Sequence, residues 1–171
     1  MKPSNTTRLQ FSKVSLSDSK ELFASAFGSK EVTKFLQWEC HDYIDQTRLL
    51  IDEMCQMHER GEKYFWVARS LIDQALIGLG SLKPDDETAW LGFLIAVEHH
   101  RKGYGLEILQ ALEDAAFCHH QGVSAAVAPS NWASLSLLKK RDWIKGDFVD
   151  GLTQFHKTGR TRRGTPTAAR A

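Results

Sequence analysis

Apolar residues form several strand-like segments in the first hundred positions of the chain. The first, 9–14, alternates apolar and polar side chains, whereas 64–69, 75–82 and 89–96 are more continuously apolar. Short polar turns separate the last three segments, and the second of these turns is expected at 83–86. The pattern therefore predicts one separate strand followed by an antiparallel meander.

Apolar side chains at helical spacing predict two helices between the first strand and the meander. A short helix is expected to be capped by Ser17 or Asp18, and a longer one is expected to begin at Asp42 or Asp45 and to end at Gly61. The longer helix carries one apolar stripe, formed by Leu49, Leu50, Met54 and Met57. Both helices are expected to flank the sheet.

Helices and strands alternate after the meander. A helix is predicted over 104–121 and ends before Gly122, a strand is predicted over 123–128, and a shorter helix over 131–141. Because a helix that joins two strands of one sheet requires them to be parallel, 89–96 and 123–128 are the expected parallel pair.

The C-terminal region completes the predicted fold. Residues 148–155 are expected to supply one or two closing strands. The tail 158–171 has four arginines, no acidic residue and no large apolar residue, so it cannot join a core and is predicted to be disordered. The predicted fold class is α/β: a single domain over 1–157 with a mixed, mostly antiparallel sheet, one parallel pair and flanking helices.

The turn between the strand at 89–96 and the next helix contains two glycines and several basic side chains. Its sequence is His100-Arg101-Lys102-Gly103-Tyr104-Gly105. Glycine lets the backbone approach a ligand closely, and the N–H groups that begin a helix lack partners at the positive end of its dipole. The turn is therefore predicted to bind a phosphate group.

The spacing of these glycines excludes two common phosphate motifs. A dinucleotide fingerprint needs a third glycine where Ile108 stands, and a P-loop needs Ser or Thr after a Gly-Lys pair. For a Gly-x-Gly taken alone, a surface turn whose glycines serve only its own shape remains the alternative.

Composition and charge narrow the range of partners and compartments. With 171 residues, 42% hydrophobic and 25% charged, the chain has the composition of a soluble globular domain. A net charge of +1 gives no reason to expect a nucleic acid or an acidic membrane as partner. Residues 1–8 do not form a signal peptide, and no apolar run approaches the roughly 20 residues that span a bilayer. Cys40, Cys55 and Cys118 form an odd set without paired spacing, so reduced thiols in the cytoplasm are expected.

Motifs in the second half of the chain match those of one known family. The phosphate motif of that family is Gln or Arg, two variable residues, Gly, one variable residue, and Gly or Ala. Gly103 and Gly105 match this motif, and His100 departs from it. A later segment, which includes Asn131 and Ser134, matches as well. Together with the order of elements, these motifs resemble the GNAT N-acetyltransferases, and among them the Rim type, which acetylates protein N-termini.

The resemblance implies a GNAT fold that binds acetyl-CoA and transfers its acetyl group to a primary amine. It places the pyrophosphate of coenzyme A on the turn formed by His100, Arg101, Lys102, Gly103, Tyr104 and Gly105. It places the pantetheine arm along the backbones of Phe93, Leu94 and Ile95, where the parallel strands splay apart. Asn131 matches a residue that hydrogen-bonds the cofactor, and its alternative role is to cap the following helix.

The same resemblance indicates which side chains would take part in catalysis. Ser134 matches a serine near the thioester sulfur, a proposed acid for the departing thiolate; because the pKa of a thiol is about 8.5, its positioning role is expected to matter more. Leu138 stands where many GNAT enzymes have a tyrosine acid, and Trp90 replaces a strand glutamate common in the Rim type. The candidate bases are Glu98, foremost, and Glu39, His41 and Glu87.

The leading acceptor is a protein or peptide N-terminus. An α-amine with a pKa of about 8 is partly neutral at pH 7 and needs less help from a base than a lysine-like amine. Direct attack in a ternary complex is favoured, because no cysteine stands beside a credible base. A small-molecule amine as acceptor, and a non-catalytic acyl-CoA-binding module, are the alternatives.

Two further expectations concern metals and assembly. No metal site is expected, because the adjacent side chains of Cys118, His119 and His120 point in different directions on a helix. Both a monomer and a homodimer are compatible with the sequence.

Overall fold

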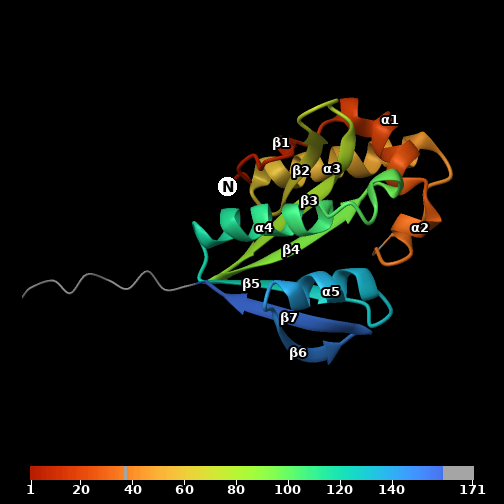
Figure 1. The fold of residues 1–171 in the computed structure, drawn as a ribbon. Coiled ribbons are helices and arrows are strands. Elements are labelled where there is room, and N and C mark those ends of the chain that lie inside the picture. Colours follow the sequence, from red (N-terminus) through yellow and green to blue (C-terminus); the bar gives the residue numbers. More distant parts are fainter. Residues whose placement is uncertain (37, 160–171) are drawn as a thin grey trace, which may run out of the picture.

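A seven-stranded sheet forms the centre of the molecule in the computed structural model, which describes residues 1–36 and 38–159 (Figure 1). The strand order is β1-β2-β3-β4-β5-β7-β6. The strands are β1 (Leu9–Lys13), β2 (Tyr64–Ser70), β3 (Leu76–Asp85), β4 (Thr88–Ile95), β5 (Gly122–Val127), β6 (Ile144–Val149) and β7 (Leu152–Thr158). Neighbouring strands of this described sheet are antiparallel except β4 and β5, which confirms the predicted fold class.

The predicted meander is present, but its last turn is tighter than expected. β3 continues to Asp85, through residues predicted to form the turn at 83–86, because its last three residues pair with the first three of β4. The reversal therefore involves only Asp86 and Glu87. Asp86 adopts φ +45°, the positive φ that short hairpin turns require.

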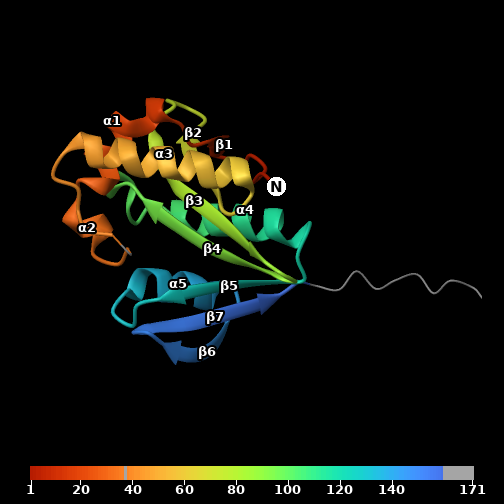
Figure 2. The ribbon, with the colours of Figure 1, turned by 180° about the vertical axis from the view of Figure 1, so that it is seen from behind.

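Helices cover both faces of the sheet. α1 (Ser19–Leu22) and α3 (Ile44–Arg60) lie on one face, and α4 (Tyr104–Phe117) and α5 (Trp132–Lys140) lie on the other (Figures 1 and 2). Two buried apolar clusters fill the core of the described residues, one containing α3 side chains and the other α4 side chains. In the described parts of the chain, no helix is long and apolar enough to span a membrane.

The two predicted helices of the N-terminal half are confirmed with small shifts. α3 ends at Gly61 as expected, and Gly61 adopts the left-handed φ of +72° that favours glycine at a helix end. The shorter helix opens earlier than predicted, in a 3₁₀ turn whose N-cap is Ser15. Asp18 accepts a hydrogen bond from the Ser15 N–H (2.8 Å) and occupies the N-cap position of α1. The remaining short segments are η1 (Leu16–Asp18), η2 (Phe23–Phe27), α2 (Lys30–Thr33) and η3 (Val97–His99).

The predicted parallel pair is confirmed, but its strands pair over a short stretch only. The register joins Thr88, Ala89 and Trp90 of β4 to Gly122, Val123 and Ser124 of β5. Beyond Trp90 the two strands diverge, and Figure 1 shows them moving apart toward their carboxyl ends. We call this divergence the β4–β5 separation; α4 follows β4 and α5 follows β5, so both helices begin near its wide end.

The helix α4 ends at Phe117 rather than near Gln121. The Gln121 N–H donates to the Glu87 carbonyl (2.8 Å) and not to a helix carbonyl, so the chain has left the helix before the predicted stop. Gly122, predicted to end the helix, is instead the first residue of β5.

Two closing strands, β6 and β7, are present, but they begin at Ile144 and end at Thr158, so they extend beyond the predicted range 148–155 at both ends. Thr158 is the last residue of β7, and the Gly159 N–H donates to the Gln121 carbonyl (2.7 Å), so ordered structure reaches past the predicted domain boundary at 157. The rest of the predicted tail, 160–171, lies outside the described residues.

One buried carboxylate ties the C-terminal half to α4. Glu113 of α4 is 1% exposed and accepts hydrogen bonds from Trp143 Nε1 (2.7 Å), Arg141 Nη2 (2.6 Å) and Lys157 Nζ (2.8 Å). Burial by itself would raise the pKa of Glu113, but the hydrogen bonds from Arg141, Lys157 and Trp143 outweigh burial and lower it. The charged carboxylate thus holds α5 and β7 in a fixed place relative to α4.

Candidate active site

Alternate residues of β4 direct their backbone groups toward β3. The Gly92 carbonyl accepts a hydrogen bond from the Ser81 hydroxyl (3.4 Å), and the Leu94 carbonyl points at Gly78. Ala96 lies just past the end of β4, and its N–H donates to the carbonyl of residue 77 in β3 (2.9 Å).

The residues between them face the β4–β5 separation. Because backbone groups alternate sides along a strand, Phe93 and Ile95 direct their N–H and C=O groups toward the separation. Of the three backbones expected to contact a pantetheine arm, the structure therefore places two on the separation. It places the third, Leu94, on the β3 side, with a buried side chain.

His100 closes the end of this strand edge. The Ala96 N–H faces β3, so the Ile95 carbonyl of the same trans peptide points the opposite way, toward the separation. The His100 ring has its Nε2 3.0 Å from that carbonyl, so an Nε2–H donates to it. Its Nδ1 lies 3.4 Å from a carboxylate oxygen of Glu31 on α2. His100, which departs from the family motif, thus links the end of β4 to α2.

The phosphate turn leaves the start of α4 without a side-chain cap in the described structure. Gly103 is the N-cap residue, with φ +83°, and Arg101 also adopts a positive φ of +60°. The first helical bond runs from the Glu107 N–H to the Gly103 carbonyl (3.4 Å), so the N–H groups of residues 104–106 precede it. Arg101 and Lys102 have exposed side chains. This geometry presents backbone donors and positive charge together, as an anion site requires.

Close packing, and not only ligand binding, explains why residue 105 is a glycine. A Cβ at this position would lie 2.9 Å from Leu137 Cδ1 of α5 and 3.5 Å from Phe93 Cε2 of β4. The missing side chain therefore lets α4 approach both neighbours closely.

Asn131 and Ser134 lie on the β5 side of the separation, at the start of α5. Asn131 Oδ1 accepts a hydrogen bond from the Ser134 N–H (3.1 Å), so the alternative role of helix N-cap is present. Both residues are half-buried. Leu138, one turn further on, is 2% exposed and belongs to the core, so this position serves packing.

The candidate bases are scattered. Glu98 is exposed in η3, directly after β4, and is the carboxylate nearest in sequence to the free edge. Glu39 is exposed in the loop before α3, where His41 is half-buried with its Nδ1 2.8 Å from Thr47 Oγ1. Burial lowers the pKa of His41. Glu87 lies in the β3–β4 turn, at the joined end of the parallel pair, and is therefore not brought to the separation.

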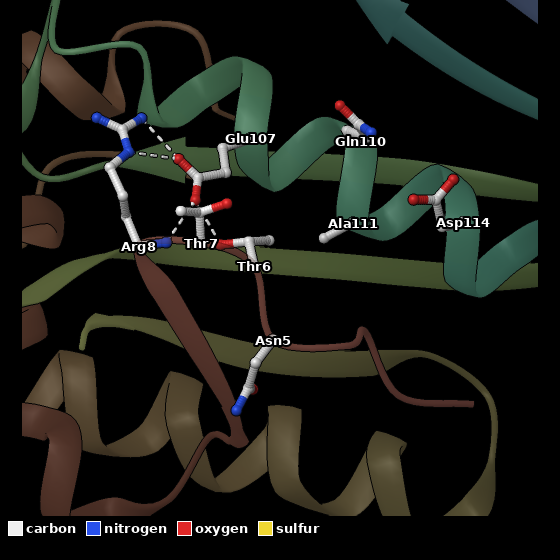
Figure 3. A pocket seen from close by; sticks show the side chains of 8 residues that line it. All are labelled: Asn5, Thr6, Thr7, Arg8, Glu107, Gln110, Ala111 and Asp114. Atoms are coloured by element: carbon white, nitrogen blue, oxygen red, sulfur yellow. Dashed lines mark hydrogen bonds and ion pairs between the residues drawn. The ribbon is translucent and has the colours of Figure 1, made fainter.

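A surface depression of about 440 Å³ lies beside the first turns of α4 (Figure 3). It is lined by Asn5, Thr6, Thr7, Arg8, Glu107, Gln110, Ala111 and Asp114, none of which belongs to the predicted site. Over residues 1–36 and 38–159, no group of three or more His, Cys, Asp or Glu side chains is arranged to hold a metal ion.

The family follows from a match that spans most of the chain. Residues 8–142 match the family described as the acetyltransferase (GNAT) domain. The chain belongs to the GNAT acetyltransferase family. A comparison with curated protein sequences finds no match.

Several solved GNAT structures have the same fold. RimL, a ribosomal L7/L12 alpha-N-protein acetyltransferase solved with coenzyme A, has a TM-score of 0.78 at 15% identity, over 92% of this chain and 98% of its own. An acetyl transferase from Salmonella typhimurium that modifies the N-terminal serine of L7/L12 has a TM-score of 0.75 at 15% identity, over 91% and 97%. Spermidine N-acetyltransferase from Vibrio cholerae, solved with CoA and spermine, has a TM-score of 0.75 at 15% identity, over 90% and 96%.

The predicted phosphate turn also contacts a distant part of the chain. Arg8 Nη1 donates to the Lys102 carbonyl (3.1 Å), and the Arg8 guanidinium also pairs with Glu107 in the first turn of α4. Nothing local in the sequence indicates this contact. The only available signal is an acidic residue placed at a helix start that is expected to bind an anion.

Proposed function

We propose that this GNAT protein is an acetyl-CoA-dependent acetyltransferase whose acceptor is the α-amine of a protein or peptide N-terminus. The observation that carries the proposal is the edge of β4 beyond Trp90, which pairs with no other strand among the described residues and ends near the uncapped start of α4. An extended chain with amide groups could pair with Phe93 and with the Ile95 N–H, since the Ile95 carbonyl is already bonded to His100, while phosphate groups reach the turn.

The residues of this chain fit coenzyme A in two respects. The N–H groups of the turn, with the side chains of Arg101 and Lys102, suit a pyrophosphate. Asn131 keeps its amide NH₂ group for a ligand while its Oδ1 caps α5. Bound acetyl-CoA supplies the acetyl thioester.

The protein contributes orientation and proton transfer. The N–H groups on the free edge of β4 would stabilise negative charge that develops on the acetyl carbonyl oxygen. Glu98, acting through water, would accept the proton of the attacking amine, and Ser134 would orient the departing sulfur. Attack is direct, with no covalent enzyme intermediate.

The choice of acceptor is supported by two kinds of likeness. The Rim-type motifs around Gly103 and Asn131, and the fold shared with RimL, favour a peptide N-terminus. A small-molecule amine is the second candidate, because a spermidine acetyltransferase shares the fold to a similar degree. A cytoplasmic location belongs to the same proposal, because the three cysteines are free thiols.

The first experiment is calorimetric titration with acetyl-CoA, with ATP and NAD as controls. Saturable binding of acetyl-CoA alone supports the proposal, and its absence contradicts it. The acceptor is then identified by mass spectrometry after incubation with acetyl-CoA and either peptides with free N-termini or spermidine. N-terminally blocked versions of the same peptides are the matched control; acetylation of blocked peptides at lysine would contradict an α-amine acceptor.

A further inference from the structure

We propose that Arg8 is a positioning residue for the phosphate turn. It holds the Lys102 carbonyl away from a bound pyrophosphate and neutralises Glu107, the acid in the first turn of α4. The inference rests on the proposed function, since it assumes that the turn holds the pyrophosphate of coenzyme A.

Arg8 contacts both the turn and the first turn of α4, and Figure 3 shows its guanidinium facing Glu107. Its Nη1 donates to the Lys102 carbonyl (3.1 Å), and its guanidinium carbon lies 4.3 Å from the centre of the Tyr104 ring. Its Nε and Nη2 lie 2.8 and 2.6 Å from the same carboxylate oxygen, Glu107 Oε2, so two donors of one guanidinium share this oxygen in the ion pair. The Arg8 backbone is itself fixed, because its carbonyl accepts the Leu71 N–H (2.9 Å).

The contact with Lys102 determines which side of the peptide faces the ligand. In a trans peptide the Lys102 carbonyl and the Gly103 N–H point in opposite directions. With the carbonyl bonded to Arg8, the Gly103 N–H is directed away from Arg8. Without that bond, nothing among the described contacts would keep the Lys102 carbonyl oxygen, which repels phosphate, turned aside.

The contact with Glu107 neutralises a carboxylate that would otherwise repel a phosphate bound at the start of α4. A carboxylate in the first turn of a helix is attracted to the same positive end of the dipole that binds phosphate. Burial works to raise the pKa of Glu107, but hydrogen bonds from Thr6 and Arg8 outweigh burial and lower it, so the carboxylate is charged at neutral pH. Arg8 cancels this charge and holds the carboxylate on the side of the N-terminal segment.

Charge removal on each side of the pair should have opposite effects on cofactor affinity. Arg8→Gln removes the positive charge that neutralises Glu107 and is expected to weaken coenzyme A binding about tenfold at low salt. Glu107→Gln removes the repelling group and is expected to leave the affinity unchanged or raised. The double variant R8Q/E107Q should recover most of the loss seen in R8Q.

A role in folding alone predicts a different pattern. Both single variants would then weaken binding to a similar degree, and the double variant would show no recovery. The second readout is turnover with S-acetylpantetheine, a thioester without the pyrophosphate. R8Q should leave this turnover unchanged while its KM for acetyl-CoA rises, whereas a misfolded protein loses both activities. If R8Q does not fold, Arg8→Lys is the second variant. It keeps the positive charge but not the planar guanidinium with its several N–H donors, so its affinity for coenzyme A is expected to lie between those of the unmodified protein and R8Q.

The outcomes distinguish an error in the proposed function from an error in the role of Arg8. If the unmodified protein fails to bind coenzyme A, the proposed function is wrong. If it binds and Gly103→Val abolishes binding while R8Q binds normally, only the inference about Arg8 is wrong. Equal weakening by R8Q and E107Q, with no recovery in the double variant, also overturns it.

Discussion

Two helices begin near the wide end of the β4–β5 separation, and their first turns are built differently. α5 begins with Asn131, whose side chain accepts the Ser134 N–H, so part of its helix start is satisfied internally. α4 begins with Gly103, which has no side chain to offer, and no described side chain replaces it. A helix start that is left uncapped is less stable but remains available for an anion. The α5 start is thus capped by Asn131, whereas the α4 start has no side-chain cap in the described structure and is the one proposed to bind a phosphate.

The largest expected effect is at the uncapped start. Gly103→Val forces a β-branched residue to φ +83° and should weaken coenzyme A binding roughly hundredfold, measured by calorimetry. Gly151→Val is the matched control, because Gly151 has φ +80° in the β6–β7 turn with open space around it. It should destabilise the protein and leave coenzyme A affinity unchanged. Equal loss of affinity in both variants would show that strain alone explains the effect.

The next effect concerns the buried Glu113 carboxylate, which links α4 to the C-terminal end of α5 and to β7. Glu113→Gln leaves the guanidinium of Arg141 and the ammonium of Lys157, both mostly buried, without their charged partner. We expect the free energy of unfolding in urea to fall by about 3 kcal/mol. The exposed Glu53→Gln on α3 is the control and should be near neutral.

The same tie predicts a pH dependence. The pKa of Glu113 is lowered in the folded state, so its stabilisation is fully present above the unfolded pKa of about 4.3. It is lost as the pH falls through the folded pKa. The unmodified protein should therefore lose stability more steeply below pH 4.5 than Glu113→Gln, in urea titrations at several pH values. Parallel curves would mean that Glu113 is not the group responsible.

A smaller effect is expected at the capped start. Asn131→Ala removes the cap of α5 and should lower the free energy of unfolding by about 1 kcal/mol, whereas Asn131→Asp keeps an acceptor and should restore it. If the amide NH₂ also contacts the cofactor, N131D will fold normally but bind coenzyme A more weakly. Normal affinity in N131D would restrict Asn131 to capping.

The smallest effect is expected at His100. His100→Ala removes the hydrogen bond to the Ile95 carbonyl and should weaken acetyl-CoA binding by about threefold. His100→Gln should recover it, because an amide N–H can donate to the same carbonyl. Glu31→Gln should have no measurable effect, since the Glu31 side chain is 60% exposed. A larger loss in E31Q than in H100A would assign the main role to the α2 contact.

Much of this arrangement is predictable from local patterns. Apolar periodicity and turn residues identify the meander, α3 with its Gly61 end, and the parallel pair on either side of α4. The glycines at Gly103 and Gly105 mark the phosphate turn, because positive φ and close packing both restrict residue type. These features depend on residues close together in the chain.

The features that could not be predicted depend on distant partners. Arg8 meets Glu107 across 99 positions, and Glu113 gathers donors from α5 and β7 that no spacing rule connects. The side of β4 on which Leu94 lies depends on its register with β3. The early end of α4 depends on β5 joining the sheet at Gly122 rather than on helix propensity.

The hydrogen bond between His100 and the Ile95 carbonyl gives the free edge of β4 a definite end. The pairing with β5 stops at Trp90, so the accessible edge runs for about 16 Å at roughly 3.3 Å per residue. The phosphate turn follows directly after that end. An extended ligand that engages both places must have a matching span between its phosphate and its reactive end. If the turn holds a phosphate as proposed, the strand edge and the turn would together select a ligand by its length as well as by its charge.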